Sequence, residues 1–64
     1  MDKQFIDLFI GQVFDYEFMF DDVFIRGIKK SSRTALMFLD KDDDFIMYFS
    51  KNSIVRETNI FTVI

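Results

Sequence analysis

The most regular pattern along the chain is the alternation of apolar and polar positions over Val13–Phe20. Acidic side chains occupy one face of this segment, and aromatic side chains occupy the other: Phe14, Tyr16, Phe18 and Phe20. A period of two residues is the signature of a half-buried β-strand. The segment therefore predicts a strand with an aromatic inner face.

A second alternating segment, Val23–Lys30, follows the pair Asp21-Asp22. A two-residue turn at this pair predicts a hairpin in which Glu17 faces Arg26, and a four-residue loop is the alternative. The two-residue turn also brings apolar positions together on the other face: Phe20 with Val23, Phe18 with Ile25, and Tyr16 with Gly27. Gly27 in mid-strand predicts either a sharp bend around a core or an ordinary bulge.

The segment Asp2–Ile10 predicts a short N-terminal α-helix. Asp2 is a suitable N-cap, apolar side chains recur four residues apart, and Gly11 stands where a glycine ends many helices. An extended N-terminus is the alternative, because so short a helix is marginal unless its apolar stripe is docked.

Three further strands follow the hairpin. Thr34–Leu39 and Phe45–Phe49 are continuously apolar, which is typical of strands buried on both faces. Ile54–Ile64 is a final extended stretch, interrupted near Thr58-Asn59. The prediction is a mainly β fold in a single domain, residues 1–64: a short N-terminal α-helix and then a five-stranded, strongly bent antiparallel sheet, an SH3-like or Sm-like small barrel.

Composition excludes most catalytic chemistry. The 64 residues include no Cys and no His, so nucleophile–histidine triads, ordinary zinc sites and disulfides are absent. Carboxylate pairs occur only in predicted exposed turns, whereas acid–base catalysis needs a shielded cleft. We therefore predict no catalytic residues, no enzyme activity and no cofactor.

The acidic run Asp40–Asp44 is a candidate calcium loop. Its aspartates stand at the first, third and fifth places of an EF-hand loop. The sixth place, which needs Gly, is Phe45, and the twelfth, which needs Glu, is Lys51. We predict no metal here and interpret the run as a solvated turn that keeps neighbouring strand edges from pairing.

A basic cluster is the main candidate for binding. Four of the eight cationic residues fall within eight positions: Arg26, Lys29, Lys30 and Arg33. Two serines lie between them, so the cluster is suited to a phosphate or a nucleic-acid backbone. The alternative is a solubilising loop, because the net charge of −3 opposes broad non-specific binding to nucleic acid.

The abundance of apolar side chains predicts association. Half of the chain is apolar and 19% is aromatic, which is more than a domain of this size easily hides. A tightly packed Phe-rich monomer is the alternative. The apolar residues without an evident place in a monomer are the predicted interface residues: Met19, Phe24, Phe45 and Phe49.

The apolar runs of the sequence are too short to span a membrane. The longest apolar runs are far below the roughly 20 residues that span a bilayer, and the first residues lack the pattern of a secretory signal. We predict no membrane partner and a cytoplasmic location.

Several segments resemble the Sm-like small β-barrel family, which includes the bacterial RNA chaperone Hfq. Phe5-Ile6 is similar to a Phe-Leu of that family's helix, Val23–Gly27 to its bend glycine segment, and Leu36–Leu39 to its apolar third strand. Met47–Ile54 is similar to its fourth strand and turn, although this chain has no histidine for the family's Lys-His pair. The resemblance implies a pore position near Tyr48, Lys51 and Asn52.

Two functions follow as hypotheses. The first is a non-catalytic homo-oligomeric module that binds RNA or a nucleotide through the basic cluster with Tyr48 and Lys51. The second is a small acidic adaptor or inhibitor of the kind encoded by phages, which docks on a host protein. Its anchors would be Met19, Phe24 and aromatics of the last strand, with Asp40–Asp44 steering it to a basic partner.

Overall fold

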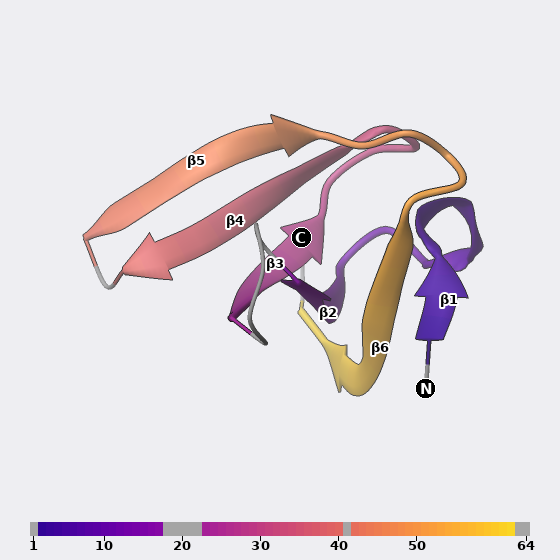
Figure 1. Ribbon diagram of the computed structural model, residues 1–64, viewed down its shortest axis with the longest axis horizontal. Coiled ribbons are helices and arrows are strands. Elements are labelled where there is room, and N and C mark those ends of the chain that lie inside the picture. Colours follow the sequence, from indigo (N-terminus) through magenta and orange to yellow (C-terminus); the bar gives the residue numbers. More distant parts are fainter. Residues whose placement is uncertain (1, 18–22, 41, 63–64) are drawn as a thin grey trace.

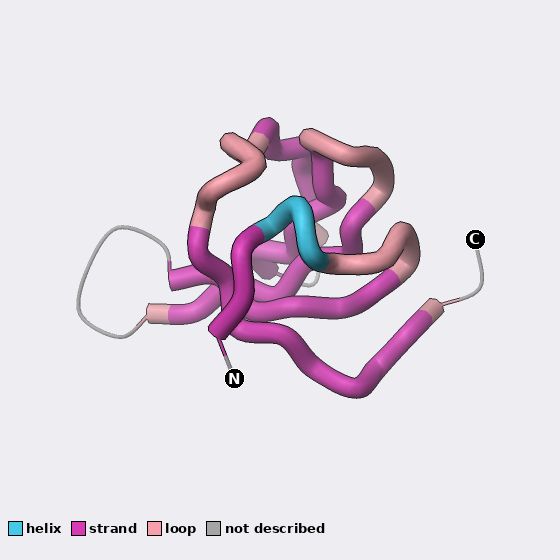
Figure 2. The backbone as a smooth tube through the Cα atoms, turned by 90° about the vertical axis from the view of Figure 1, so that its right-hand side faces the viewer, coloured by secondary structure: helices cyan, strands magenta, loops and turns pink. Residues whose placement is uncertain are grey.

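Six antiparallel strands form one strongly bent sheet in the computed structural model, which describes residues 2–17, 23–40 and 42–62 (Figure 1). The elements in chain order are β1 (Asp2–Gln4), the 3-10 turn η1 (Phe5–Asp7), β2 (Gln12–Glu17), β3 (Phe24–Lys29), β4 (Thr34–Asp40), β5 (Asp43–Tyr48) and β6 (Ile54–Phe61). The strand order β1-β6-β2-β3-β4-β5 leaves the sheet open, with β1 and β5 at its edges. The strands curve around a common interior (Figure 2), and the extents of 24 × 23 × 21 Å reflect this bend. The mainly β prediction is confirmed.

The predicted N-terminal helix is wrong. Backbone N–H groups of this segment bind the turn before β6 instead: Phe5 N donates to Ser53 O (2.7 Å), and Ile6 N, which would donate to Asp2 O in the helix, donates to Lys51 O (3.1 Å). β1 continues this pairing along β6, so the segment gains sheet hydrogen bonds that an isolated short helix would lack. Gly11 has φ of 90°, but it serves the turn into β2 rather than a helix end.

The β2–β3 hairpin forms with a register two residues away from the predicted one. Asp15, rather than Glu17, faces Arg26, and Glu17 faces Phe24. A shift of two residues keeps every side chain on its predicted face, because the pleat has a period of two. The predicted pairs of Phe18 and Phe20 lie outside the described residues.

The predicted burial of β4 and β5 on both faces is also wrong. Ala35 and Met37 are buried, whereas Ile46 and Tyr48 are 53% and 79% exposed. A single bent sheet encloses one interior, so one face of these strands packs inward and the other faces outward. An apolar run does not reveal this difference, because both faces carry apolar side chains.

Phenylalanine rings form the centre of the core. Phe5 stacks on Phe49 with ring centroids 4.5 Å apart, and Phe14 meets both rings edge to face at 5.6 Å. Gly27 faces Phe14 from β3, and a Cβ there would overlap Met37 Sδ. The ladders on both sides of Gly27 run without a register shift, so the residue is not a bulge. Its role is to let β3 pass close to the core.

The interruption predicted near Thr58-Asn59 is a register shift rather than a break. β6 continues to Phe61, but its pairing with β2 jumps between Glu57 opposite Phe14 and Phe61 opposite Gln12. Thr58 stabilises the shift, because its hydroxyl donates to Val13 O and its carbonyl accepts from Gln12 Nε2.

Candidate nucleic-acid interface

Two turns meet at one end of the β4–β5 hairpin, at the upper right of Figure 1. Arg33, in the turn between β3 and β4, holds Phe49, in the turn after β5. Phe49 N donates to Arg33 O (2.7 Å), and Arg33 Nε donates to Phe49 O (2.8 Å). The two turns therefore form one surface.

The β3–β4 turn is shaped by its own hydroxyls. Ser31 Oγ and Thr34 Oγ1 are 2.6 Å apart, and the N–H groups of Arg33 and Thr34 donate to Ser31 Oγ. Lys30 N donates to Thr34 O (2.9 Å) and closes the turn. Small hydroxyl residues commonly order turns in this way. As a result, the exposed side chains of Lys30 and Arg33 extend from a defined backbone.

The β5–β6 turn supplies the remaining residues. Ser53 N donates to Ser50 O, and Asn52 N donates to Ser50 Oγ, which leaves Lys51 and Asn52 exposed at the tip. Tyr48 lies opposite Thr34 and is the most exposed large apolar side chain among the described residues, at 79%. We call this surface the basic end: Lys30, Arg33, Tyr48, Lys51 and Asn52.

Lys29 is separated from the exposed cations. Its side chain is buried, and its ammonium donates to Phe5 O (2.9 Å) and Leu8 O (2.8 Å) and lies 4.7 Å from the Phe5 ring centre. Desolvation lowers the pKa of Lys29, and the negative charge of Asp7 offsets part of that effect. This lysine binds the chain around η1, so a ligand in solvent does not reach it.

Arg26 is also apart from the basic end. It lies four residues before Lys30 along β3, roughly 13 Å at the rise of a strand. Its Nε donates to Asp15 Oδ1 at 3.0 Å, and this hydrogen bond and charge raise the pKa of Arg26. Its positive charge is thus already neutralised by a cross-strand partner.

The predicted interface residues divide between core and surface. Phe49 is buried in the aromatic core, and Phe45 is half-buried against it. Phe24 is 39% exposed and lies under the Arg56 guanidinium, 4.4 Å from ring centre to Cζ. Met19 lies outside the described residues.

Other exposed apolar residues were missed by sequence reasoning. Phe38 and Ile46 lie on the outer faces of β4 and β5, and Ile54 begins β6. The sequence contained one indication of this exposed face. Thr34 stands two residues before Leu36 in β4, and Tyr48 two residues after Ile46 in β5, so each hydroxyl-bearing residue shares a strand face with an apolar one. Hydroxyls on one alternating set of positions indicate the face nearer to water.

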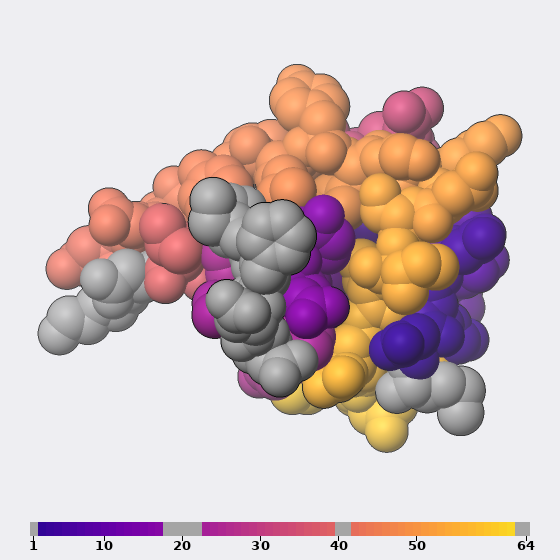
Figure 3. All heavy atoms as spheres, viewed as in Figure 1, coloured from indigo at the N-terminus to yellow at the C-terminus, as the bar shows by residue number. Residues whose placement is uncertain are grey.

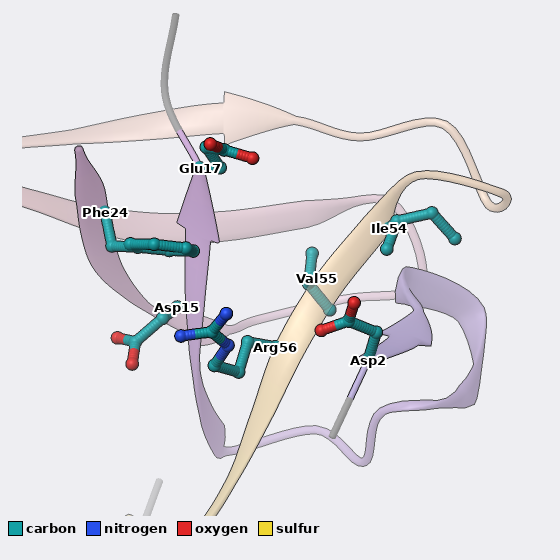
Figure 4. A pocket seen from close by; sticks show the side chains of 7 residues that line it. All are labelled: Asp2, Asp15, Glu17, Phe24, Ile54, Val55 and Arg56. Carbon is teal, nitrogen blue, oxygen red and sulfur yellow. The ribbon is translucent and has the colours of Figure 1, made fainter. Parts of the chain in front are cut away.

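A small pocket of about 80 Å³ lies on the outer side of β1, β6, β2 and β3 (Figure 4). Its lining combines apolar side chains, Arg56 and three carboxylates, as follows: Asp2, Asp15, Glu17, Phe24, Ile54, Val55 and Arg56. Ligand sites for small molecules usually exceed 300 Å³, so this volume suits one side chain rather than a nucleotide. Within the described residues, no group of three acidic side chains is arranged to hold a metal ion.

No family model, curated protein or solved structure matches this chain. Among residues 2–17, 23–40 and 42–62, no helix has the length and apolar character to cross a bilayer.

Proposed function

We propose that this protein is a non-catalytic module that binds single-stranded RNA at the basic end. The observation that carries the proposal is the pair of hydrogen bonds between Arg33 and Phe49, which joins three exposed cations to an exposed tyrosine. Single-stranded nucleic acid is bound by this combination, since cations contact phosphates and an aromatic ring stacks on a base.

Each member of the basic end has a distinct task. Lys30, Arg33 and Lys51 neutralise backbone phosphates, and the ring of Tyr48 stacks on an unpaired base. Asn52 offers both a donor and an acceptor to a base edge. RNA single strands fit better than duplexes, because a stacked duplex would not present a base face to Tyr48.

The distribution of charge supports the proposal despite the net charge of −3. Asp42, Asp43 and Asp44 are exposed at the far tip of the β4–β5 hairpin, which projects to the left in Figures 1 and 3. The length of β5, six residues, separates this tip from the basic end.

Binding of a fluorescent single-stranded RNA, followed by anisotropy at low salt, tests the proposal. Tyr48→Ala should weaken binding by roughly 1–3 kcal/mol for the lost stacking, whereas Tyr48→Phe retains a ring and most of the affinity. Lys51→Ala should weaken binding to every sequence alike. Arg26→Gln is the matched control, because it removes an equal charge outside the basic end. Equal losses in Arg26→Gln and Lys51→Ala would refute a localised site.

A second candidate is an adaptor that docks on a basic protein partner. The pocket beside Phe24 favours it, because Asp2 and Glu17 place negative charge in its lining beside a partly exposed ring and suit a basic side chain, whereas Asp15 already binds Arg26 and the ring already carries Arg56. Phe24→Ala and Glu17→Gln should then abolish capture of a partner while leaving RNA binding unchanged. Retention of the partner by both variants would exclude this surface.

A further inference from the structure

We infer that two copies of this chain pair through β5, antiparallel and around a two-fold axis that passes by Ile46. The inference goes beyond RNA binding and does not depend on it. Within the described residues, β5 is an edge strand of six residues whose outer side has no partner. Natural proteins usually protect such an edge with lysine, proline or a bulge in the strand. The start of β5 has such protection, in Asp43, Asp44 and the register shift of the β4–β5 pairing between Phe38 and Asp40, but between Asp44 and Ser50 the chain has neither a charged residue nor a proline.

Among the described residues, the outer face of β4 and β5 is largely apolar and exposed. Cross-strand pairs place Phe38 beside Asp44, Leu36 beside Ile46 and Thr34 beside Tyr48 on this face. Phe38, Ile46 and Tyr48 are 38%, 53% and 79% exposed. Pairing of two β5 edges would join two such faces and bury apolar surface along the seam, in addition to satisfying the edge hydrogen bonds.

Symmetry and chemistry determine the register. Residues directly opposite each other in a sheet point to the same face, whereas neighbouring residues of one strand point to opposite faces. An axis between two neighbouring residues would place them opposite each other, so the axis must pass through a residue. With Ile46 opposite its own copy, Phe45 faces Met47 of the partner and Asp44 faces Tyr48. A register centred on Phe45 would place Asp44 against Ile46 and leave fewer apolar pairs.

Charge complementarity selects the antiparallel arrangement and a second copy as the occupant. The acidic residues Asp42 and Asp43 lie at the start of β5, whereas Lys51 follows its end, two residues after Phe49, to which Arg33 is bonded. In the antiparallel pair, Asp42 of one copy lies opposite Ser50 of the other and next to Lys51. A parallel pair would instead bring the acidic tips together, which like charges disfavour.

The opposite end of the sheet argues against a ring built from strand edges. A ring needs two different edges of each copy to pair, and β1, the other edge, has only three residues. β1 also covers Ile54–Arg56 of β6. A two-fold pair uses the long β5 edge twice, so it is the closed arrangement that this sheet favours.

Disulfide trapping tests the pairing, because the natural chain has no cysteine. Opposite residues of an antiparallel pair have Cα atoms about 4.5–5.5 Å apart, within the range of a disulfide. Ile46→Cys should therefore form a covalent dimer under mild oxidation. Ile54→Cys is the matched control, since Ile54 is as exposed (57%) but lies on β6. Tyr48→Cys should also remain uncrosslinked, because its copies would be roughly 13 Å apart along the strands.

The free chain should have twice the mass of one copy in size exclusion with light scattering. Ile46→Lys places two ammonium groups at the axis and should raise the dissociation constant roughly tenfold or more. Because Ile46 is half exposed, this variant should fold normally, as a circular-dichroism melt would show. A wild-type monomer up to millimolar concentration, or crosslinking of Ile54→Cys or Tyr48→Cys as efficient as that of Ile46→Cys, would overturn the inference.

These outcomes are separable from those of the proposed function. Trapping and mass measurements contain no nucleic acid, so loss of RNA binding would leave the pairing intact. A monomeric wild-type chain that still binds RNA through Tyr48 would refute the pairing alone.

Discussion

Lys29 shows how a residue type can mislead when its surroundings are unknown. In the sequence it belongs to a run of cations, but the chain uses it to bind two carbonyl groups beside η1. A buried lysine is uncommon because desolvation of an ammonium costs free energy unless hydrogen bonds compensate. The alternation along β3 could have indicated that Lys29 is buried, because Lys29 shares the inner face with Ile25 and Gly27.

Lys29→Met should lower the free energy of unfolding by about 1–3 kcal/mol, because Leu8 O would lose its donor inside the protein. Lys30→Met is the control, and its exposed side chain predicts a change within about 0.5 kcal/mol. Urea denaturation of both variants measures the difference. Equal stabilities of the two variants would contradict the structural role of Lys29.

The pKa of Lys29 adds a pH dependence with a defined sign. Burial lowers its pKa below the ordinary value of 10.5, so the folded state releases its proton at a lower pH than the unfolded state. Between these two pKa values the unfolded chain holds more protons, and stability rises with pH. The stability gap between wild type and Lys29→Met should therefore widen as pH rises from neutral towards 10.5. A gap that narrows would show that the folded state instead raises the pKa.

Among the elements, those governed by local pattern were predicted and those governed by long-range pairing were not. The alternation of Val13–Phe20 identified the aromatic inner face, and Phe14 and Tyr16 do pack on the core. The hairpin register was two residues off, because Asp21-Asp22 does not specify a loop length. The N-terminal segment became a strand because β6, some fifty residues away, offers it hydrogen bonds.

Packing of β3 on β4 depends on Gly27. A Cβ at this position would overlap Met37 Sδ and press on Phe14, both of which are fully buried. Gly27→Ala should therefore lower stability by about 1–3 kcal/mol through overpacking. In the double variant Gly27→Ala, Met37→Val the shorter side chain makes room, so its loss should be smaller than the sum of the two single losses. Additive losses in thermal or urea denaturation would contradict this account of the glycine.

For the whole molecule, the basic end was predicted only in part. Sequence reasoning proposed Lys30, Arg33, Tyr48, Lys51 and Asn52, and the two turns do bring these residues to one surface. It also included Arg26 and Lys29, because proximity in sequence does not show which strand face a side chain occupies. The separation of acidic and basic groups to opposite ends of β5 was not expected, since it depends on the length of the β4–β5 hairpin.

The salt dependence of RNA affinity tests the central claim most directly. Three cations that contact phosphates of a single strand predict a slope of log K against log salt of about −2, at roughly −0.7 per contact. Lys51→Ala should reduce the steepness by about 0.7, and Arg26→Gln should leave it unchanged. No measurable binding at low salt, or a slope near zero in the wild-type protein, would contradict a phosphate-binding basic end.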